Sequence, residues 1–179
     1  MDNFYTSCEV VERKIDDNIP IVVGANYTRS VVSSCNKAAK NLGIKAGMPI
    51  FKVKELCPSI LLLPVNFDLY EKMCQKIEKI LFEYTKNIQK TSIDEWFLNF
   101  SKNDKYLNEI ETAEFIKSKI FKNLNLKCSI GIGSNFFNAK TASYYAKPFG
   151  VFVIDEKNFK SFVWKIPINE MYMIGDKGL

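Results

Sequence analysis

The sequence predicts a protein that mixes helices and strands, of the α/β or α+β class. Short runs of β-branched and aromatic residues are interspersed with longer segments whose apolar residues recur at the helical period. Hydrophobic residues make up 47% of the 179 residues and aromatic residues 13%, which is a globular rather than a disordered composition. A chain of this length can form one core, or one core and a small lobe.

The first third of the chain predicts three strands and one short helix. The strand candidates are residues 19–23 (IPIVV), 30–35 (SVVSSC) and 60–65 (ILLLPV). Residues 36–42 predict a short helix, which Gly43 closes at its C-terminal side.

The middle of the chain predicts two amphipathic helices separated by a β-rich stretch. Residues 68–84 and 110–124 each carry their apolar side chains on one broad helical face. Residues 88–100, between them, are dense in residues that favour strands.

The last part of the chain predicts two strands around a helix. The strands are residues 126–132 and 151–154, and the helix covers residues 134–146 with Ser134 as its expected N-cap. Residues 158–164 predict a final short helix.

Several classes of chemistry are excluded by composition. The sequence contains no histidine, so Ser-His and Cys-His nucleophilic sites are absent and a zinc site is not expected. Five scattered cysteines, an odd number without a C-x-x-C pair, indicate a reducing compartment. We therefore expect an intracellular protein, cytoplasmic in a prokaryote or nuclear in a eukaryote, with no membrane partner. The net charge of +5 permits a polyanionic partner without requiring one.

Two adjacent carboxylates, Asp94 and Glu95, lie inside the apolar stretch TSIDEWFL. Neighbouring side chains of a strand point to opposite faces, so these two converge only if the chain turns there. One interpretation leaves one carboxylate in solvent and the other in a salt bridge. The other is a divalent cation bound at a strand end or turn. Mg²⁺ suits such a site, because it takes one or two protein carboxylates plus substrate phosphates.

Lysines and hydroxyls gather in the stretch SSCNKAAKNLGIKAGMP. Lys37 and Lys40 share one face of the predicted helix, and Ser33 and Ser34 precede its N-terminus, so the group could bind an anion. A solvated lysine face is the alternative. Lys147, in YYAKPFG, lies at a helix end, where a lysine is also favourable for the helix dipole.

Five blocks of the sequence resemble motifs of the Y-family, or translesion, DNA polymerases, most closely the polymerase IV type. The blocks are MDNFYTSCEVVE, VVSSCNKAAKNLGIKAGMP, LCPSILLLPVNFDLYEKM, TSIDEWFL and CSIGIGSNFFNAKTASYYAKPFG. Because they occur in the family's order over nearly the whole chain, the sequence is identified as a member of this family, as a catalytic core cut short at both ends.

The resemblance implies an α+β fold of the right-hand type. A palm of mixed or antiparallel sheet, with helices on one face, would comprise residues 1–3 and 67–154, its first strand truncated. Small α/β fingers would comprise residues 4–66. Residues 155–179 would begin the thumb, and MYMIGDKGL would open its first helix-hairpin-helix. The rest of the thumb and the little finger would be missing.

The resemblance also implies template-directed, two-metal transfer from a dNTP to a primer 3′-OH during DNA damage bypass. Asp94, Glu95 and the Met1 carbonyl would hold two Mg²⁺ ions, the two acids being catalytic. Tyr5 would be the steric gate against a ribose 2′-OH. The expected nucleotide-binding residues are Phe4, Tyr5, Ser34, Lys37, Lys40 and Lys147, and the expected roof of the base pair is Val31, Ser33 and Gly47. The implied partners are primer-template DNA, a dNTP and a sliding clamp bound through the missing C-terminal region.

The sequence departs from the family in two places. The first carboxylate of the family's D-x-D motif would precede Met1, and Asp2 matches the second. We therefore expect an upstream codon for Asp and little activity from this chain alone, with a non-catalytic DNA-binding or scaffold relative as the alternative. Lys37 and Lys40 replace the family's Tyr and Arg, so we expect a less precisely oriented triphosphate. Another palm-type nucleotidyl transferase or cyclase would leave unexplained the fingers block, VVSSCNKAAKNLGIKAGMP, which resembles the family's fingers motif.

Overall fold

The computed structural model describes residues 1–25, 27, 29–100, 108–168 and 171–172. The chain opens with helix α1 (Phe4–Arg13), which the sequence analysis did not predict. Phe4 and Cys8 lie one helical turn apart, and both are buried in the main core. Asn3 precedes the helix with a φ of 49°, in the left-handed region that asparagine tolerates. The helix therefore separates residues 1–3 from the sheet that follows.

A three-stranded sheet follows α1. Its order is β2-β1-β3, with β1 (Ile21–Gly24) antiparallel to β2 (Val32–Cys35) and parallel to β3 (Leu61–Leu63). All four residues of β1 are buried, because both faces of the sheet are covered. These strands confirm the three predicted in this part of the chain.

Two short helices pack on one face of this sheet. Helix α2 (Lys37–Asn41) was predicted, whereas α3 (Ile50–Leu56) was not. The cluster they close consists of Val22, Val32, Cys35, Ala39, Ile44, Ile50, Val53 and Cys57. The other face of the sheet, through Ile21 and Val23, belongs to the main core with α1.

The main core continues into two long helices. These are α4 (Phe67–Leu81) and α5 (Glu109–Leu124), and each begins at an asparagine whose side chain accepts backbone N–H groups of the first turn. Their apolar faces are buried against α1, the sheet and each other. Both helices confirm the amphipathic periodicity of the sequence.

Residues 88–98 form a hairpin. Strand β4 (Ile88–Ser92) pairs antiparallel with β5 (Glu95–Leu98), and the turn between them consists of Ile93 and Asp94. The register shifts between Lys90 and Ser92, next to this turn. The chain therefore turns at the acidic pair, which is the condition under which the two carboxylates can leave the alternation of a strand.

The last strands form a parallel pair with a helical crossover. Strand β6 (Ile130–Gly133) pairs with β7 (Val151–Ile154), and α6 (Phe136–Tyr145) connects them. The predicted N-cap at Ser134 is wrong, because Asn135 caps α6 by accepting the Asn138 N–H at 2.8 Å. The predicted final helix is α7 (Phe159–Val163).

Glycines allow α6 to lie directly on β6. A Cβ built on Gly131 would lie 2.1 Å from the Ala139 carbonyl oxygen and 2.1 Å from the Ser143 nitrogen. A Cβ on Gly133 would lie 2.6 Å from the Ala139 nitrogen. Only a residue without a side chain permits this approach, so the sequence GIG determines where α6 and its lysine, Lys140, lie.

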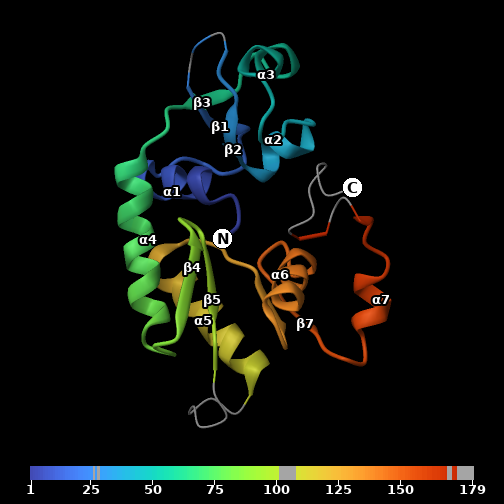
Figure 1. The fold of residues 1–179 in the computed structure, drawn as a ribbon. Helices are drawn as coiled ribbons and strands as arrows, with labels where there is room; N and C mark the ends of the chain where they lie inside the picture. Colours follow the sequence, from blue (N-terminus) through green and yellow to red (C-terminus); the bar gives the residue numbers. More distant parts are fainter. Residues whose placement is uncertain (26, 28, 101–107, 169–170, 173–179) are drawn as a thin grey trace.

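Among the described residues, the expected palm strands form two separate two-stranded sheets, one antiparallel and one parallel. The chain's first two residues connect them. The Met1 nitrogen donates to the Asp94 carbonyl at 2.8 Å, and the Asp2 nitrogen donates to the Lys127 carbonyl at 3.0 Å. In Figure 1 the N-terminus accordingly lies in the middle of the molecule, below α1 and between the β4–β5 hairpin and α6.

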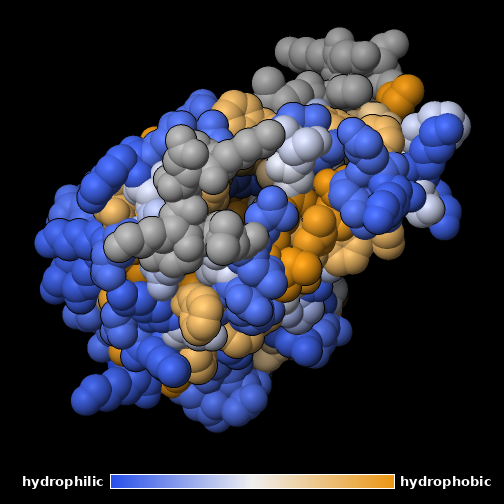
Figure 2. Space-filling model, turned by 90° about the horizontal axis from the view of Figure 1, so that it is seen from below, coloured by the Kyte–Doolittle hydropathy of each residue, from blue (hydrophilic) through white to orange (hydrophobic). Residues whose placement is uncertain are grey.

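The surface seen from below in Figure 2 is mainly hydrophilic, with hydrophobic side chains gathered near the middle of the view. Among the described residues, no helix is both long enough and apolar enough to cross a bilayer. Of the predicted thumb segment, residues 169–170 and 173–179 lie outside the described residues.

Candidate functional site

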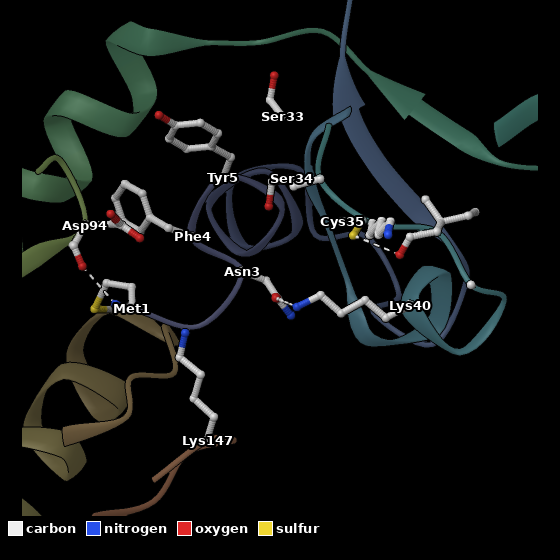
Figure 3. A pocket seen from close by; sticks show the side chains of 14 residues that line it. Met1, Asn3, Phe4, Tyr5, Ser33, Ser34, Cys35, Lys40, Asp94 and Lys147 are labelled. Atoms are coloured by element: carbon white, nitrogen blue, oxygen red, sulfur yellow. Dashed lines mark hydrogen bonds between the residues drawn. The ribbon is translucent and has the colours of Figure 1, made fainter. Parts of the chain in front are cut away.

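A pocket of about 580 Å³ lies where α1, the β2–α2 segment, the β4–β5 turn and the end of α6 meet. Its lining brings together eight of the predicted site residues: Met1, Phe4, Tyr5, Ser33, Ser34, Lys40, Asp94 and Lys147. These residues come from four distant parts of the sequence and surround one space (Figure 3). A tyrosine, a carboxylate, two serine hydroxyls and the ammonium groups of Lys40, Lys45 and Lys147 therefore share one cavity.

Asp94 reaches the pocket from the tip of the β4–β5 hairpin. Its carboxylate accepts a hydrogen bond from the Ser92 hydroxyl at 2.7 Å. Its main chain is fixed by the Met1 nitrogen, as Figure 3 shows. The turn thus holds one carboxylate at the pocket with part of its hydrogen-bonding capacity still free.

Glu95 has a different environment from its neighbour. Its carboxylate contacts the ammonium group of Lys140, on α6, and accepts the Thr91 hydroxyl at 3.0 Å. It is not among the residues that line the pocket. In this structure, then, one acid faces the pocket and the other forms a salt bridge, so the two adjacent carboxylates do not act as a symmetrical pair.

Tyr5 is held by other aromatic rings. Its ring stacks on that of Tyr70, with centroids 4.4 Å apart and planes 12° apart, and the ring of Phe67 lies nearly perpendicular to it. The Tyr70 hydroxyl donates to buried Glu9 at 3.0 Å, and Glu9 pairs with Arg13. Burial, followed by the nearby Asp94 carboxylate, raises the pKa of the Tyr5 hydroxyl. Tyr5 is therefore a fixed, neutral ring at the wall of the pocket.

The opposite wall comes from β2 and α2. Ser33 and Ser34 are the two middle residues of β2, and the Ser34 hydroxyl lies 3.3 Å from that of Thr6. The Lys40 ammonium donates to the Asn3 side-chain oxygen at 2.5 Å, which directs it toward the N-terminal segment (Figure 3). Buried Asn36 orients α2, because its side-chain oxygen accepts the N–H groups of both Ala39 and Ile21.

Lys147 enters the pocket from the turn that follows α6. Figure 3 shows its side chain extending toward Met1 and Asn3. The turn is anchored at Phe149, whose backbone N–H donates to the Asp2 carboxylate at 3.0 Å. The two lysines therefore approach the same N-terminal segment from different elements of the fold.

Four predicted residues lie outside the pocket lining. Lys37 is exposed on α2, Glu95 pairs with Lys140, Val31 forms an isolated bridge with Pro49, and Gly47 donates its N–H to the Val32 carbonyl. Conversely, the sequence analysis missed six lining residues: Asn3, Cys35, Gly43, Ile44, Lys45 and Ala46. Most of these follow Lys40 directly in the fingers block, and that proximity was the available signal.

The donor set fits a metal only in part. Among the described residues, no group of three or more histidine, cysteine, aspartate or glutamate side chains could hold an ion. The carboxylate at the pocket, Asp94, has Glu95 as its neighbour in sequence. Because Mg²⁺ is commonly held by one or two carboxylates together with substrate phosphates, these two acids fit an ion that arrives with a phosphorylated ligand.

Comparison with known proteins places the chain in a family. The sequence profile of the impB/mucB/samB family matches residues 1–144. DNA polymerase IV of Clostridioides difficile is 37% identical over 98% of this chain and 48% of the relative. DNA polymerase IV of Bacillus velezensis is 35% identical over 99% of the chain and 43% of the relative. The chain thus spans about half the length of these relatives.

Solved structures give the same result. The insertion ternary complex of Dbh DNA polymerase superposes with a TM-score of 0.90 at 30% identity, over 98% of this chain and 53% of that one. DinB from Sulfolobus solfataricus superposes with a TM-score of 0.88, also at 30% identity, over 98% of this chain and 52% of that one. Y-family DNA polymerases are metal-dependent enzymes. By profile, sequence and fold, the chain belongs to the impB/mucB/samB family of Y-family DNA polymerases.

Proposed function

We propose that the chain is the palm and fingers part of a template-directed translesion DNA polymerase that acts inside the cell. The observation that carries this proposal is the shared pocket, in which Asp94, Tyr5, Lys40 and Lys147 surround one space. A pocket with ammonium groups, hydroxyls and one carboxylate suits a polyphosphate that brings its own divalent cations. A dNTP with Mg²⁺ has this chemistry.

Asp94 and Glu95, with the Met1 carbonyl, are the proposed ligands of two Mg²⁺ ions. When bound, the ions would neutralise the charge of the phosphates and make the primer hydroxyl easier to deprotonate. Glu95 is at present neutralised by Lys140. For Glu95 to serve as a ligand, its carboxylate would be released by Lys140 or shared with it.

The triphosphate would lie between the first turn of α1 and the two lysines. Phe4 and Tyr5 are the first two residues of α1, so their N–H groups have no partner within the helix, and a helix N-terminus attracts anions. Lys40 and Lys147 add two positive charges, and Ser34 adds a hydroxyl donor. We assign Lys37 a long-range electrostatic role only, because it lies outside the lining.

Tyr5 is the proposed steric gate. Its ring is stacked on Tyr70 and in T-shaped contact with Phe67, so it has little room to move away from a larger sugar. A rigid ring under the sugar rejects a 2′-OH more strongly than a mobile one. The proposed roof of the base pair consists of Val31, Ser33 and Gly47. Val31 is 48% exposed, so it is accessible to a base.

The division into domains is also a proposal. Residues 1–3 and 67–154 would form the palm, residues 4–66 the fingers, and residues 155–179 the start of a thumb. Primer-template DNA is the proposed partner, in keeping with the ternary complex of the Dbh relative. Binding of a sliding clamp would use segments that the relatives possess beyond the half that this chain matches.

Primer extension tests the proposal. The chain, joined at both ends to the matching segments of a polymerase IV relative, is given a labelled primer-template, dNTPs and Mg²⁺. We expect extension, and we expect its loss in Asp94→Asn and Glu95→Gln but not in Glu12→Gln, which alters an exposed acid on α1. DNA binding without extension would support the alternative, a non-catalytic scaffold relative, and would contradict the polymerase.

A further inference from the structure

The carboxylate of Asp2 joins three segments that are far apart in sequence. It accepts the Ser129 hydroxyl, at 2.9 and 2.8 Å to its two oxygens, and the Phe149 N–H at 3.0 Å. The Ser129 hydroxyl also lies 3.0 Å from the same N–H. One side chain thus connects the N-terminal segment, the residue before β6 and the turn that follows α6.

Asp2 is itself rigidly held through its main chain. Its nitrogen donates to the Lys127 carbonyl at 3.0 Å, and its carbonyl accepts the Ser7 hydroxyl at 2.9 Å. The carboxylate therefore projects from a segment fixed on both sides, to α1 and to the strand region before β6. A group held in this way can act as an anchor for a third segment.

The anchored turn has a conformation that needs support. Phe149 has a φ of 52°, in the left-handed region that a bulky residue rarely occupies. Its N–H is held by Asp2 and Ser129, and its ring packs near Phe121, with centroids 5.2 Å apart. Lys147, two residues earlier, is the part of this turn that lines the pocket.

Asp2 does not line the pocket, whereas Lys147 does. We propose that Asp2 is a positioning residue: by holding the Phe149 N–H against Ser129, it orients the turn so that the Lys147 ammonium points into the pocket. The effect on nucleotide binding rests on the proposed function, whereas the orientation of Lys147 does not. The class of ligand that benefits is a polyphosphate anion, and the contribution of Asp2 to its binding passes through Lys147.

A direct test observes Lys147 without any ligand. The chain is reductively methylated with ¹³C at its lysines, and the Lys147 signal is identified by its absence from Lys147→Arg. In Asp2→Ala we expect this signal to move to the position of a freely exposed lysine. In Asp2→Asn we expect a smaller movement of the signal, because the remaining amide oxygen can still accept a hydrogen bond from the turn. Asp68→Ala, on the exposed first turn of α4, is the control and leaves the signal unchanged.

An unchanged Lys147 signal in Asp2→Ala would overturn the proposal. Ser129→Ala serves as a second variant if Asp2→Ala does not fold, because it removes one of the two groups that tie the turn to Asp2. It should move the signal in the same direction by a smaller amount. No movement in either Ser129→Ala or Asp2→Asn would likewise contradict the positioning role.

A double-mutant cycle then tests the functional consequence. Calorimetry with Mg²⁺–dATP should show Asp2→Ala and Lys147→Ala each weakening binding by about tenfold, the size of one charge-assisted contact. The double variant should also lose about tenfold, because the two changes remove the same interaction, rather than the roughly hundredfold loss of independent sites. An additive loss would overturn the proposal. If Lys147→Ala has no effect on affinity, the nucleotide site fails, and the NMR signal still decides the role of Asp2.

Discussion

The two sides of the pocket are built in different ways. The proposed fingers side, with Ser33, Ser34 and Lys40, rests on a three-stranded sheet and on a hydrophobic cluster confined to residues between Val22 and Leu62. The proposed palm side, with Asp94 and Lys147, rests on two separate two-stranded sheets of the described part of the chain. Met1 and Asp2 join these sheets by long-range hydrogen bonds. Met1 bonds to Asp94, which lies 93 positions further along the chain, and Asp2 bonds to Phe149, which lies 147 positions further along.

The two sides of the pocket should therefore differ in how strongly a substitution disturbs them. The fingers side obtains its geometry from contacts between neighbouring segments, so its elements follow from local sequence. The palm side obtains its geometry from a few long-range hydrogen bonds and from the close packing of α6 on β6. Changes on the palm side should therefore cost more stability and disturb the pocket more than matched changes on the fingers side.

The largest expected effect comes from a matched pair of glycine substitutions. Gly131→Ala places a Cβ 2.1 Å from two backbone atoms of α6, so the helix must move, and we expect a loss of about 3 kcal/mol or more. The Cβ that Gly43→Ala adds, on the fingers side, has no atom within 4 Å. Its cost comes from the φ of 82°, which an alanine adopts at a loss of about 1 kcal/mol. Denaturant unfolding of both variants measures this difference, and equal losses would remove the contrast between the two sides.

The lysine of the fingers side gives the next effect. Lys40→Ala removes one charge from the pocket and should weaken Mg²⁺–dATP binding by about tenfold. Lys40→Arg should instead strengthen binding by about threefold. A guanidinium can keep the hydrogen bond to the Asn3 side chain and also donate two parallel hydrogen bonds to a phosphate. Calorimetry compares the three proteins. Affinity that is unchanged or lower in Lys40→Arg would show that the lysine already has the better geometry.

The smallest effect concerns pH and the hairpin that carries the acids. The Trp96 indole N–H, 3.1 Å away, and the Lys90 ammonium lower the pKa of Glu78 on α4, although burial partly opposes them. Since the folded pKa lies below the unfolded value, the ionised carboxylate stabilises the fold above the unfolded pKa of about 4.3. That contribution is lost as the pH falls through the folded pKa.

Thermal unfolding from pH 7 to pH 3 should therefore show a steeper acid loss in the wild type than in Glu78→Gln. Glu114→Gln is the control, because its carboxylate is about half exposed and, among the described residues, forms its ion pair with Lys117 on the same helix. Identical slopes in all three proteins would mean that Glu78 contributes no pH-dependent support to the β4–β5 hairpin.

The sequence was most informative where structure is local. The faces of α4 and α5 follow the helical period, and the strands of the fingers side are continuous apolar runs. Helix α1 was missed because its buried positions include Thr6 and Glu9, which break the apolar pattern. The hairpin turn stayed one of two alternatives for the acidic pair, because Ile93 and Asp94 replace the glycine and asparagine that usually mark such turns.

The site was predicted chiefly through its resemblance to a family, and the structure adds what pattern alone could not give. The separation of Asp94 from Glu95 depends on Lys140, which lies 45 residues away in sequence. The orientation of Lys147 depends on Asp2, at the other end of the chain. Contacts of this kind leave no periodicity or local motif, because the partners meet only when the fold is complete.

The most direct test of the account is the affinity of this chain for dATP with and without Mg²⁺, measured by calorimetry for the wild type, Asp94→Asn and Glu12→Gln. We expect Mg²⁺-dependent binding that Asp94→Asn weakens by tenfold or more, since a phosphate-bound ion loses its carboxylate, and that Glu12→Gln leaves unchanged. Equal affinities in all three proteins, or binding indifferent to Mg²⁺, would contradict the claim that Asp94 and the two lysines hold one nucleotide.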